Sequence, residues 1–229
     1  MHQIIDLINR GNQRGGRMLS VIDLIEAGTL SVQQAAWLAV RIFDGASFLV
    51  GARPGGAGKT TVMGALLGLL PDKTSAHLAK PGTGWRESRT GDCIVAYEVS
   101  AGSYEAYIWG GDLRLFCRCG RSGRRIVSNL HADTIEEAED QIVKENGVER
   151  RDFLSFDIFL PIRVRSRLKR IERRVDSIYV VEDERWLMAT PDAGPREQKC
   201  QGFFESCLLE GVKRIEEVRE RWVRLATDL

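Results

Sequence analysis

The stretch from Ser47 to Met63, SFLVGARPGGAGKTTVM, constrains the fold more than any other part of the chain. It begins with a short apolar run bounded by glycine and proline, which is typical of a buried strand. A glycine-rich loop ending in Gly58-Lys59-Thr60 follows, and then the apolar run TVMGALLGLL predicts a helix that ends before Pro71. A strand, a glycine loop and a helix in this order predict a phosphate-binding loop.

The chemistry of such a loop explains which residues should bind. Its glycines let backbone N–H groups turn inward around phosphate oxygens, at the N-terminus of a helix whose dipole favours negative charge. Lys59 supplies a mobile positive charge, and the hydroxyl of Thr60 is the expected ligand for Mg²⁺. The expected nucleotide-binding residues are Pro54, Gly55, Gly56, Ala57, Gly58, Lys59, Thr60 and Thr61.

One position departs from the phosphate-loop pattern. Arg53 stands where the pattern has its first glycine. This position mainly helps the chain to leave the strand, and Pro54 fixes the next φ angle in any case. The alternative interpretation, a glycine-rich turn with a lysine beside it, does not account for the flanking strand and helix. We therefore expect a functional loop.

The other elements follow from periodicity and capping signals. Strands and helices alternate, which favours an α/β layered domain, and capping boxes mark helix starts at Ser31 with Gln34 and at Thr134 with Glu137. We expect a P-loop NTPase fold of the RecA-like type, with a central, mostly parallel β-sheet flanked by helices. Outside the loop, the expected helices are 3–9, 19–28, 31–45, 134–147 and 203–229, and the expected strands are 75–79, 93–100, 104–111, 124–130, 155–166 and 173–183.

Composition narrows the function classes. The 229 residues carry 33 Lys and Arg against 32 Asp and Glu, so no global field attracts nucleic acid or an anionic membrane. The five cysteines lack the spacing of a zinc site or a disulfide framework, which predicts buried thiols in a reducing compartment. We find no signal-peptide pattern and no apolar run of the roughly 18 residues that a membrane span needs. We expect a cytoplasmic protein without a transmembrane segment.

Two separated motifs resemble a known family. The approach SVIDLIEAGTLSVQQAAWLAVRIFDGASFLVGA, followed by GAGKTT, resembles the lead-in and loop of the type II/IV secretion ATPases, which drive pilus, archaellum and conjugation machines. Further on, RSGRRIVSNLHADTIEEAEDQI resembles the histidine box of the same family. In that box Arg124 stands where a histidine is common, and Asn129 where a threonine is. The resemblance covers roughly residues 19 to 146.

The resemblance implies an ATPase that uses ATP and Mg²⁺ and assembles as a homo-oligomeric ring, with a membrane-associated protein as a partner. It implies that His131 reports the γ-phosphate, that Glu98 resembles a glutamate that orients water, and that Asp112 matches the acid of a later strand. Without the resemblance, two other interpretations stay open. Glu98 could be a strand residue that faces solvent, and Asp112 could be a turn residue. The expected organisation is an N-terminal segment (1–18), a P-loop ATPase core (19–155), and a strand pair and helix (156–229) packed on that core.

A basic stretch leaves two interpretations open. Residues 163–174 carry seven basic residues and the single acid Glu172, and Arg163, Arg165 and Arg167 would share one strand face. The stretch reads either as a solvated hairpin whose charges protect a sheet edge or as a contact for nucleic acid or an acidic protein. Nucleic acid is the less favoured partner, because the stretch has no aromatic residue on which bases could stack. Two functional alternatives to an ATPase remain, a non-catalytic nucleotide-binding regulator and a nucleic-acid-linked NTPase.

Overall fold

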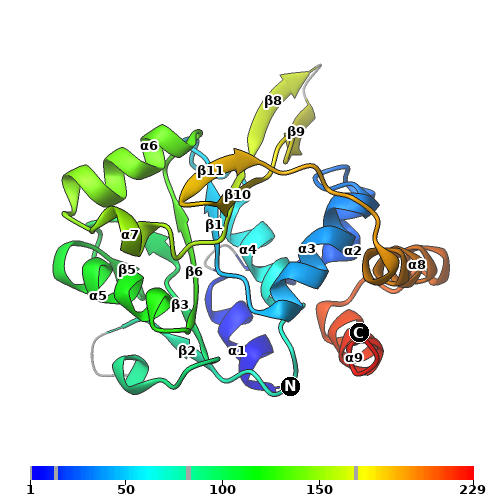
Figure 1. The fold of residues 1–229 in the computed structure, drawn as a ribbon. Helices are drawn as coiled ribbons and strands as arrows, with labels where there is room; N and C mark the ends of the chain where they lie inside the picture. The colour runs from blue at the N-terminus through cyan, green and yellow to red at the C-terminus, as the bar shows by residue number, and fades with distance from the viewer. Residues whose placement is uncertain (1, 13–14, 81–83, 168–169) are drawn as a thin grey trace.

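The computed structural model describes residues 2–12, 15–80, 84–167 and 170–229. Its centre is a seven-stranded sheet in the order β11-β10-β7-β1-β6-β3-β2 (Figure 1). Two small pairs, β4 with β5 and β8 with β9, lie outside that sheet. The strands are β1 (Phe48–Gly51), β2 (Ala76–Leu78), β3 (Cys93–Val95), β4 (Glu98–Val99), β5 (Tyr107–Ile108), β6 (Arg125–Leu130), β7 (Ile158–Pro161), β8 (Arg163–Arg167), β9 (Arg170–Arg174), β10 (Tyr179–Glu182) and β11 (Arg185–Met188).

The sheet is mostly parallel, which confirms the predicted fold class. Strand β1 pairs in parallel with β6 and β7, and β3 joins β6 to β2 in the same sense, whereas β10 and β11 run antiparallel at one edge. The strand next to β1 in the sequence, β2, lies at the far edge of the sheet. Ligands of open α/β sheets bind beyond the carboxyl ends of the strands, where the strand order reverses. The end of β1 therefore lies at the expected place for a site.

Helices cover both faces of the sheet (Figure 1). In β1, Phe48 and Val50 join one apolar cluster and Leu49 joins the other, which explains why this strand is apolar throughout. The first cluster contains α1, α2, α3, α4, α8 and α9, and the second contains α5, α6 and α7. The helices are α1 (His2–Arg10), α2 (Val21–Glu26), α3 (Val32–Asp44), α4 (Lys59–Leu67), α5 (Gly110–Arg121), α6 (Ile135–Glu139), α7 (Arg150–Phe153), α8 (Pro195–Glu210) and α9 (Ile215–Ala226), with a 3-10 turn at Gly84–Glu87 and a π-helical segment at Asp140–Glu145 that continues α6.

The C-terminal helix α9 holds the far end of α4. Arg219 is fully buried and donates to the carbonyls of Gly68 (3.0 Å) and Leu70 (2.7 Å), just beyond the last turn of α4. Trp222 Nε1 donates to the carbonyl of Leu69 at 2.7 Å. Carbonyls at a helix C-terminus lack partners within the helix, and a cation there is favoured by the dipole. These contacts fix the helix that carries the phosphate loop.

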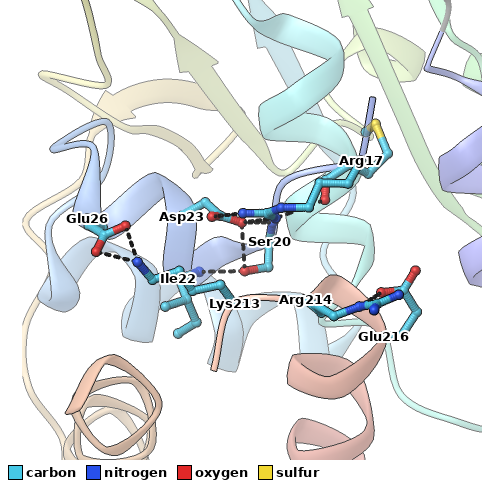
Figure 2. A network of polar contacts seen from close by, with 9 residues as sticks. Arg17, Ser20, Ile22, Asp23, Glu26, Lys213, Arg214 and Glu216 are labelled. Carbon is cyan, nitrogen blue, oxygen red and sulfur yellow. Dashed lines mark hydrogen bonds and ion pairs between the residues drawn. The ribbon is translucent and has the colours of Figure 1, made fainter. Parts of the chain in front are cut away.

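Polar contacts hold both ends of α2, and those at its end tie it to the segment between α8 and α9 (Figure 2). The Ser20 hydroxyl accepts from Ile22 N–H, and Asp23 accepts from the Ser20 N–H at 2.8 Å, which completes a capping box. Arg17 donates to both oxygens of Asp23, and Lys213 donates to both oxygens of Glu26. The network anchors the chain that leads into α3 and β1.

Several predicted elements are confirmed locally. Helices α2 and α3 lie within the expected ranges, with the capping box of Ser31 and Gln34 in place. Strand β2 lies within the expected range 75–79. The Thr134 hydroxyl caps α6 by accepting from Glu137 N–H, and Gly147 ends this helical region with a φ of 66°. All five cysteines are buried and free.

Other predictions were wrong. The strand expected at 104–111 is limited to Tyr107–Ile108, and Gly110–Arg121 is a helix that buries Leu113, Phe116 and Cys117 at helical spacing. The single C-terminal helix is two helices, because Gly211 adopts a left-handed φ of 70° after α8.

The two long strands expected at 155–166 and 173–183 are also divided. Strand β7 ends at Pro161, and β10 begins only after a break that follows β9. Between them β8 and β9 form an antiparallel hairpin that projects from the body (Figure 1). Asp176 lies 3.5 Å from Arg163, 3.6 Å from Arg165 and 3.5 Å from Arg174. Arg163 and Arg165 therefore share a face as predicted, and the side chain of Arg167 lies outside the described residues.

No helix in the described ranges is long and apolar enough to span a membrane. The proposed division of the chain after residue 155 stays a prediction.

Candidate functional site

The glycine-rich loop that is predicted to bind phosphate lies between β1 and α4. A Cβ at Gly51, the last residue of β1, would lie 2.4 Å from the Ala132 carbonyl oxygen and 2.6 Å from the Phe159 ring, so only glycine fits there. Within the loop, Gly56 and Gly58 have φ angles of 80° and 94°, which disfavour any residue with a Cβ. Gly58 is the N-cap of α4 and makes no side-chain cap. The first N–H groups of this helix thus have no capping side chain and suit an anion.

Backbone contacts bring three segments together at this end of the sheet. Ala52 N–H donates to the Leu130 carbonyl at 3.2 Å, which joins the start of the loop to the end of β6. On the other side of β6, Ala96 N–H donates to Val127 and Asn129 Nδ2 donates to the Tyr97 carbonyl at 3.0 Å. These bonds place the segment that leads into Glu98 beside the strand that leads into His131.

Lys59, Glu98 and His131 meet there. Lys59 Nζ lies 3.5 Å from Glu98 Oε1 and 3.4 Å from His131 Nδ1, and it donates to the Ala52 carbonyl at 3.3 Å. His131 Nε2 lies 3.7 Å from Glu98 Oε1. Lys59 and Glu98 are buried, while the side chain of His131 is 47% exposed. A buried ion pair therefore has one neighbour that solvent can reach.

Burial governs the electrostatics of the pair. It raises the pKa of Glu98 above the usual glutamate value, and the nearby charges of Lys59 and His131 only partly offset it. Burial likewise lowers the pKa of Lys59, and Glu98 opposes that shift. Within the part of the chain that the structure describes, Glu98 Oε1 accepts no hydrogen bond. A buried carboxylate with an unused acceptor atom and a raised pKa is suited to hold a water molecule and take its proton.

His131 and the residues after it hold the loop at Arg53. His131 Nδ1 lies 3.0 Å from the Arg53 carbonyl oxygen, which fits an N–H at Nδ1 that donates to this carbonyl, while Nε2 is the ring nitrogen that faces Glu98. Arg53 N–H donates to Asp133 Oδ1 at 2.8 Å, and Arg53 Nη2 pairs with Glu137 Oε1 at 2.7 Å. The residue at the missing glycine position is thus bound on three sides. Asp133 and Glu137 were not among the residues predicted for the site.

Thr60 and Thr61 lie half-buried in the first turn of α4, beside Lys59. Thr60 stands where a hydroxyl can ligate a magnesium ion held by a nucleotide. Across the described residues, no three His, Cys, Asp or Glu side chains gather in a way that would hold a metal ion. The Thr60 hydroxyl suits Mg²⁺ that arrives with phosphate oxygens, because such an ion needs only one or two protein ligands.

Asp112 lies apart from this cluster. It is in the first turn of α5, where its carboxylate pairs with Arg86 at 2.6 Å, and its side chain is 41% exposed. No hydrogen bond or ion pair links it to Lys59, Glu98 or His131 in the described structure. An acid in the first turn of a helix is favoured by the helix dipole. The strand expected before Asp112 ends at Ile108, so Asp112 lies in a helix and not directly at a strand end, and its role as an acid of the site stays a prediction.

Comparisons with known proteins give matches in structure only. A scan against models of known protein families finds no match, and a search among curated proteins finds none either. Among solved structures, the chain is similar to the VirB11 ATPase of the Brucella suis type IV secretion system in complex with sulphate, at 17% identity and a TM-score of 0.48, over 69% of this chain and 54% of that one. It is also similar to the Legionella pneumophila ATPase DotB, at 13% identity and a TM-score of 0.46, over 89% of this chain and 57% of that one. The chain thus covers little more than half of the length of either protein.

Proposed function

We propose that this chain binds ATP with Mg²⁺ at the phosphate loop and hydrolyses it. The observation that carries the proposal is the meeting of Lys59, Glu98 and His131 beside the glycine loop that precedes α4. Each comes from a different segment of the chain, and the buried pair is costly for a fold to maintain without a use. The resemblance to the secretion ATPases supports the same assignment of these three residues.

The residues have distinct proposed roles. Backbone N–H groups of the loop and of the first turn of α4 bind phosphate oxygens, and Lys59 leaves the Ala52 carbonyl to contact the terminal phosphates. The Thr60 hydroxyl would hold Mg²⁺, which would neutralise charge on the phosphate oxygens. In hydrolysis the oxygen of a water molecule bonds to the γ-phosphorus and the bond to the β-phosphate oxygen breaks. Glu98 Oε1 accepts the proton of that water, and His131, whose Nε2 lies 3.7 Å from Glu98 Oε1, contacts the terminal phosphate.

Assembly and location follow the resemblance. We propose a homo-oligomeric ring in the cytoplasm, with a membrane-associated protein as its partner. Light scattering after size exclusion, with and without a non-hydrolysable ATP analogue, tests the ring. A monomer under every nucleotide condition would contradict it.

The decisive experiment measures ATP binding by calorimetry and phosphate release for the wild type and for Lys59→Ala. We expect the substitution to weaken ATP binding by about 100-fold, because it removes a buried charge-assisted contact to phosphate. Lys144→Ala is the control, since Lys144 is exposed and pairs with Asp140. Wild-type protein that does not bind ATP would overturn the proposal. Binding that needs Lys59 but gives no turnover in any assembly state would instead favour the non-catalytic regulator.

A further inference from the structure

The hairpin of β8 and β9 contacts the phosphate loop through one arginine. In the register of the hairpin, Val164 faces Arg173, whereas Arg163 faces Arg174. Facing pairs share a side of a two-stranded sheet, and neighbouring residues lie on opposite sides. Val164 packs against the main apolar core, so Arg173 is on the side that faces the body. Arg174 is on the other side, with Asp176.

Arg173 binds the middle of the loop. Its Nε and Nη2 both donate to the Gly56 carbonyl oxygen, at 3.3 Å and 3.1 Å. Its Cδ would lie 3.2 Å from a Cβ built at Gly58, so its stem covers that glycine closely. Arg173 is half-buried, unlike the exposed Arg174. The contact joins residues that are 117 positions apart in the sequence.

This contact completes the fixation of one peptide group. The N–H of the Gly56–Ala57 peptide donates to the Pro54 carbonyl at 3.2 Å, and its carbonyl accepts from Arg173. A phosphate loop binds anions only while its N–H groups, and not its carbonyls, face the phosphates. Gly56 has a positive φ and no Cβ, so this peptide rotates easily when nothing holds it. Two bonds from a guanidinium hold the carbonyl on the side of the hairpin.

We propose that Arg173 is a positioning residue that fixes the Gly56–Ala57 peptide of the phosphate loop and so couples the β8–β9 hairpin to nucleotide binding. The coupling of the hairpin to nucleotide binding, which is the second half of this inference, rests on the proposed function. The first half concerns the loop itself and can be measured without nucleotide.

The test uses the full chain with Arg173→Met, which keeps the apolar stem over Gly58, and with Arg173→Lys, which keeps the charge. Arg174→Met is the matched control on the opposite side of the same strand. Hydrogen exchange of the nucleotide-free protein, followed in a fragment covering residues 52–60, reports the loop. We expect exchange about tenfold faster in Arg173→Met, an intermediate effect in Arg173→Lys, and no change in the control. ATP affinity should fall by about tenfold in Arg173→Met, with turnover at saturation altered less than about twofold, because the loss lies in binding.

Exchange and affinity equal to those of the wild type in both Arg173 variants would overturn the inference. An equal loss in Arg174→Met would overturn it too, since any change in the hairpin would then have the same effect. If the wild type binds no ATP but exchange still rises only in the Arg173 variants, the proposed function fails and the positioning role stands. Thermal unfolding of each variant shows whether it is folded. If Arg173→Met is not folded, the same comparison is made with Arg173→Lys.

Discussion

Glu98 and Asp112 are carboxylates of two neighbouring regions, and they differ in burial and in their hydrogen-bond partners. Glu98 is 6% exposed, lies against Lys59 and His131, and leaves Oε1 without a hydrogen bond from any described residue. Asp112 is partly exposed, with 41% of its side chain in solvent, and has Arg86 as a partner at 2.6 Å. The carboxylate of Asp112 thus has an ion-pair partner near the surface, whereas one carboxylate oxygen of Glu98, beside the loop, has no hydrogen bond within the described part of the chain.

This difference in burial and pairing indicates which of the two acids can react. A surface ion pair such as that of Asp112 contributes about 0–1 kcal/mol to stability and needs no further explanation. A buried acid whose pKa is raised by burial is disfavoured in its charged form, and such groups gather at functional sites. We therefore propose the water-orienting role for Glu98 and expect only a local structural role for Asp112. The following predictions test that contrast, from the largest effect to the smallest.

Glu98→Gln should lower ATP turnover by about 100-fold or more, because the amide cannot accept the proton of the attacking water. ATP affinity should stay within about threefold, since Lys59 and the loop N–H groups remain. Phosphate release and calorimetry measure the two quantities separately. Turnover equal to that of the wild type would remove Glu98 from the mechanism.

His131→Gln should lower turnover by about tenfold, because a single hydrogen bond to a charged phosphate contributes on that scale. The glutamine side chain can still reach the Arg53 carbonyl, so the loop should keep its place. A fall in ATP affinity that exceeds the fall in turnover would show that His131 holds the loop and does not report the phosphate. Steady-state kinetics over a range of ATP concentrations separates these outcomes.

Glu98→Gln should also change how stability depends on pH. Because the pKa of Glu98 is raised in the folded protein, its contribution to stability is complete below the usual glutamate pKa and is lost as pH rises through the raised value. The glutamine cannot ionise, so the variant should gain stability relative to the wild type from acid to neutral pH. Urea unfolding at several pH values measures this difference. A difference that does not change with pH would contradict the raised pKa.

Asp112→Asn should have the smallest effect, with turnover within about twofold of the wild type and stability lower by no more than about 1 kcal/mol. It loses only a surface ion pair with Arg86. A loss of turnover comparable to that of Glu98→Gln would reverse the contrast between the two acids. The same phosphate-release assay and urea titration serve for both variants.

The sequence predicts the loop well because its signals are local. Glycines at positive φ, an apolar strand and an apolar helix all lie within Ser47 to Leu67, and the structure contains each of them. Helix α5 was missed because Gly110 and Gly111 read as a break, and the helical spacing of Leu113, Phe116 and Cys117 begins only after them. A short window cannot show that these side chains have a sheet to pack on.

The sequence motifs could not predict contacts between residues that are far apart in the sequence. Only the resemblance to a known family pointed to Glu98 and His131, and their roles in the reaction stay predictions. The types of these two residues gave no reason to expect them within 4 Å of each other. Arg173 reaches Gly56 across 117 positions and Asp133 reaches Arg53 across 80. A single sequence records no such pairing, because charged residues of this kind occur all along the chain and only the strand order decides which of them meet.

Arg53 carries a lesson for anyone who would repair the loop by design. Arg53→Gly would make the phosphate-loop pattern complete and would raise any score of motif agreement. It would also remove the ion pair with Glu137 and add backbone freedom to the segment that His131 and Asp133 hold. The better-matching sequence would thus be the looser protein, so agreement with a motif is a poor guide to which residue an engineer should install at this position.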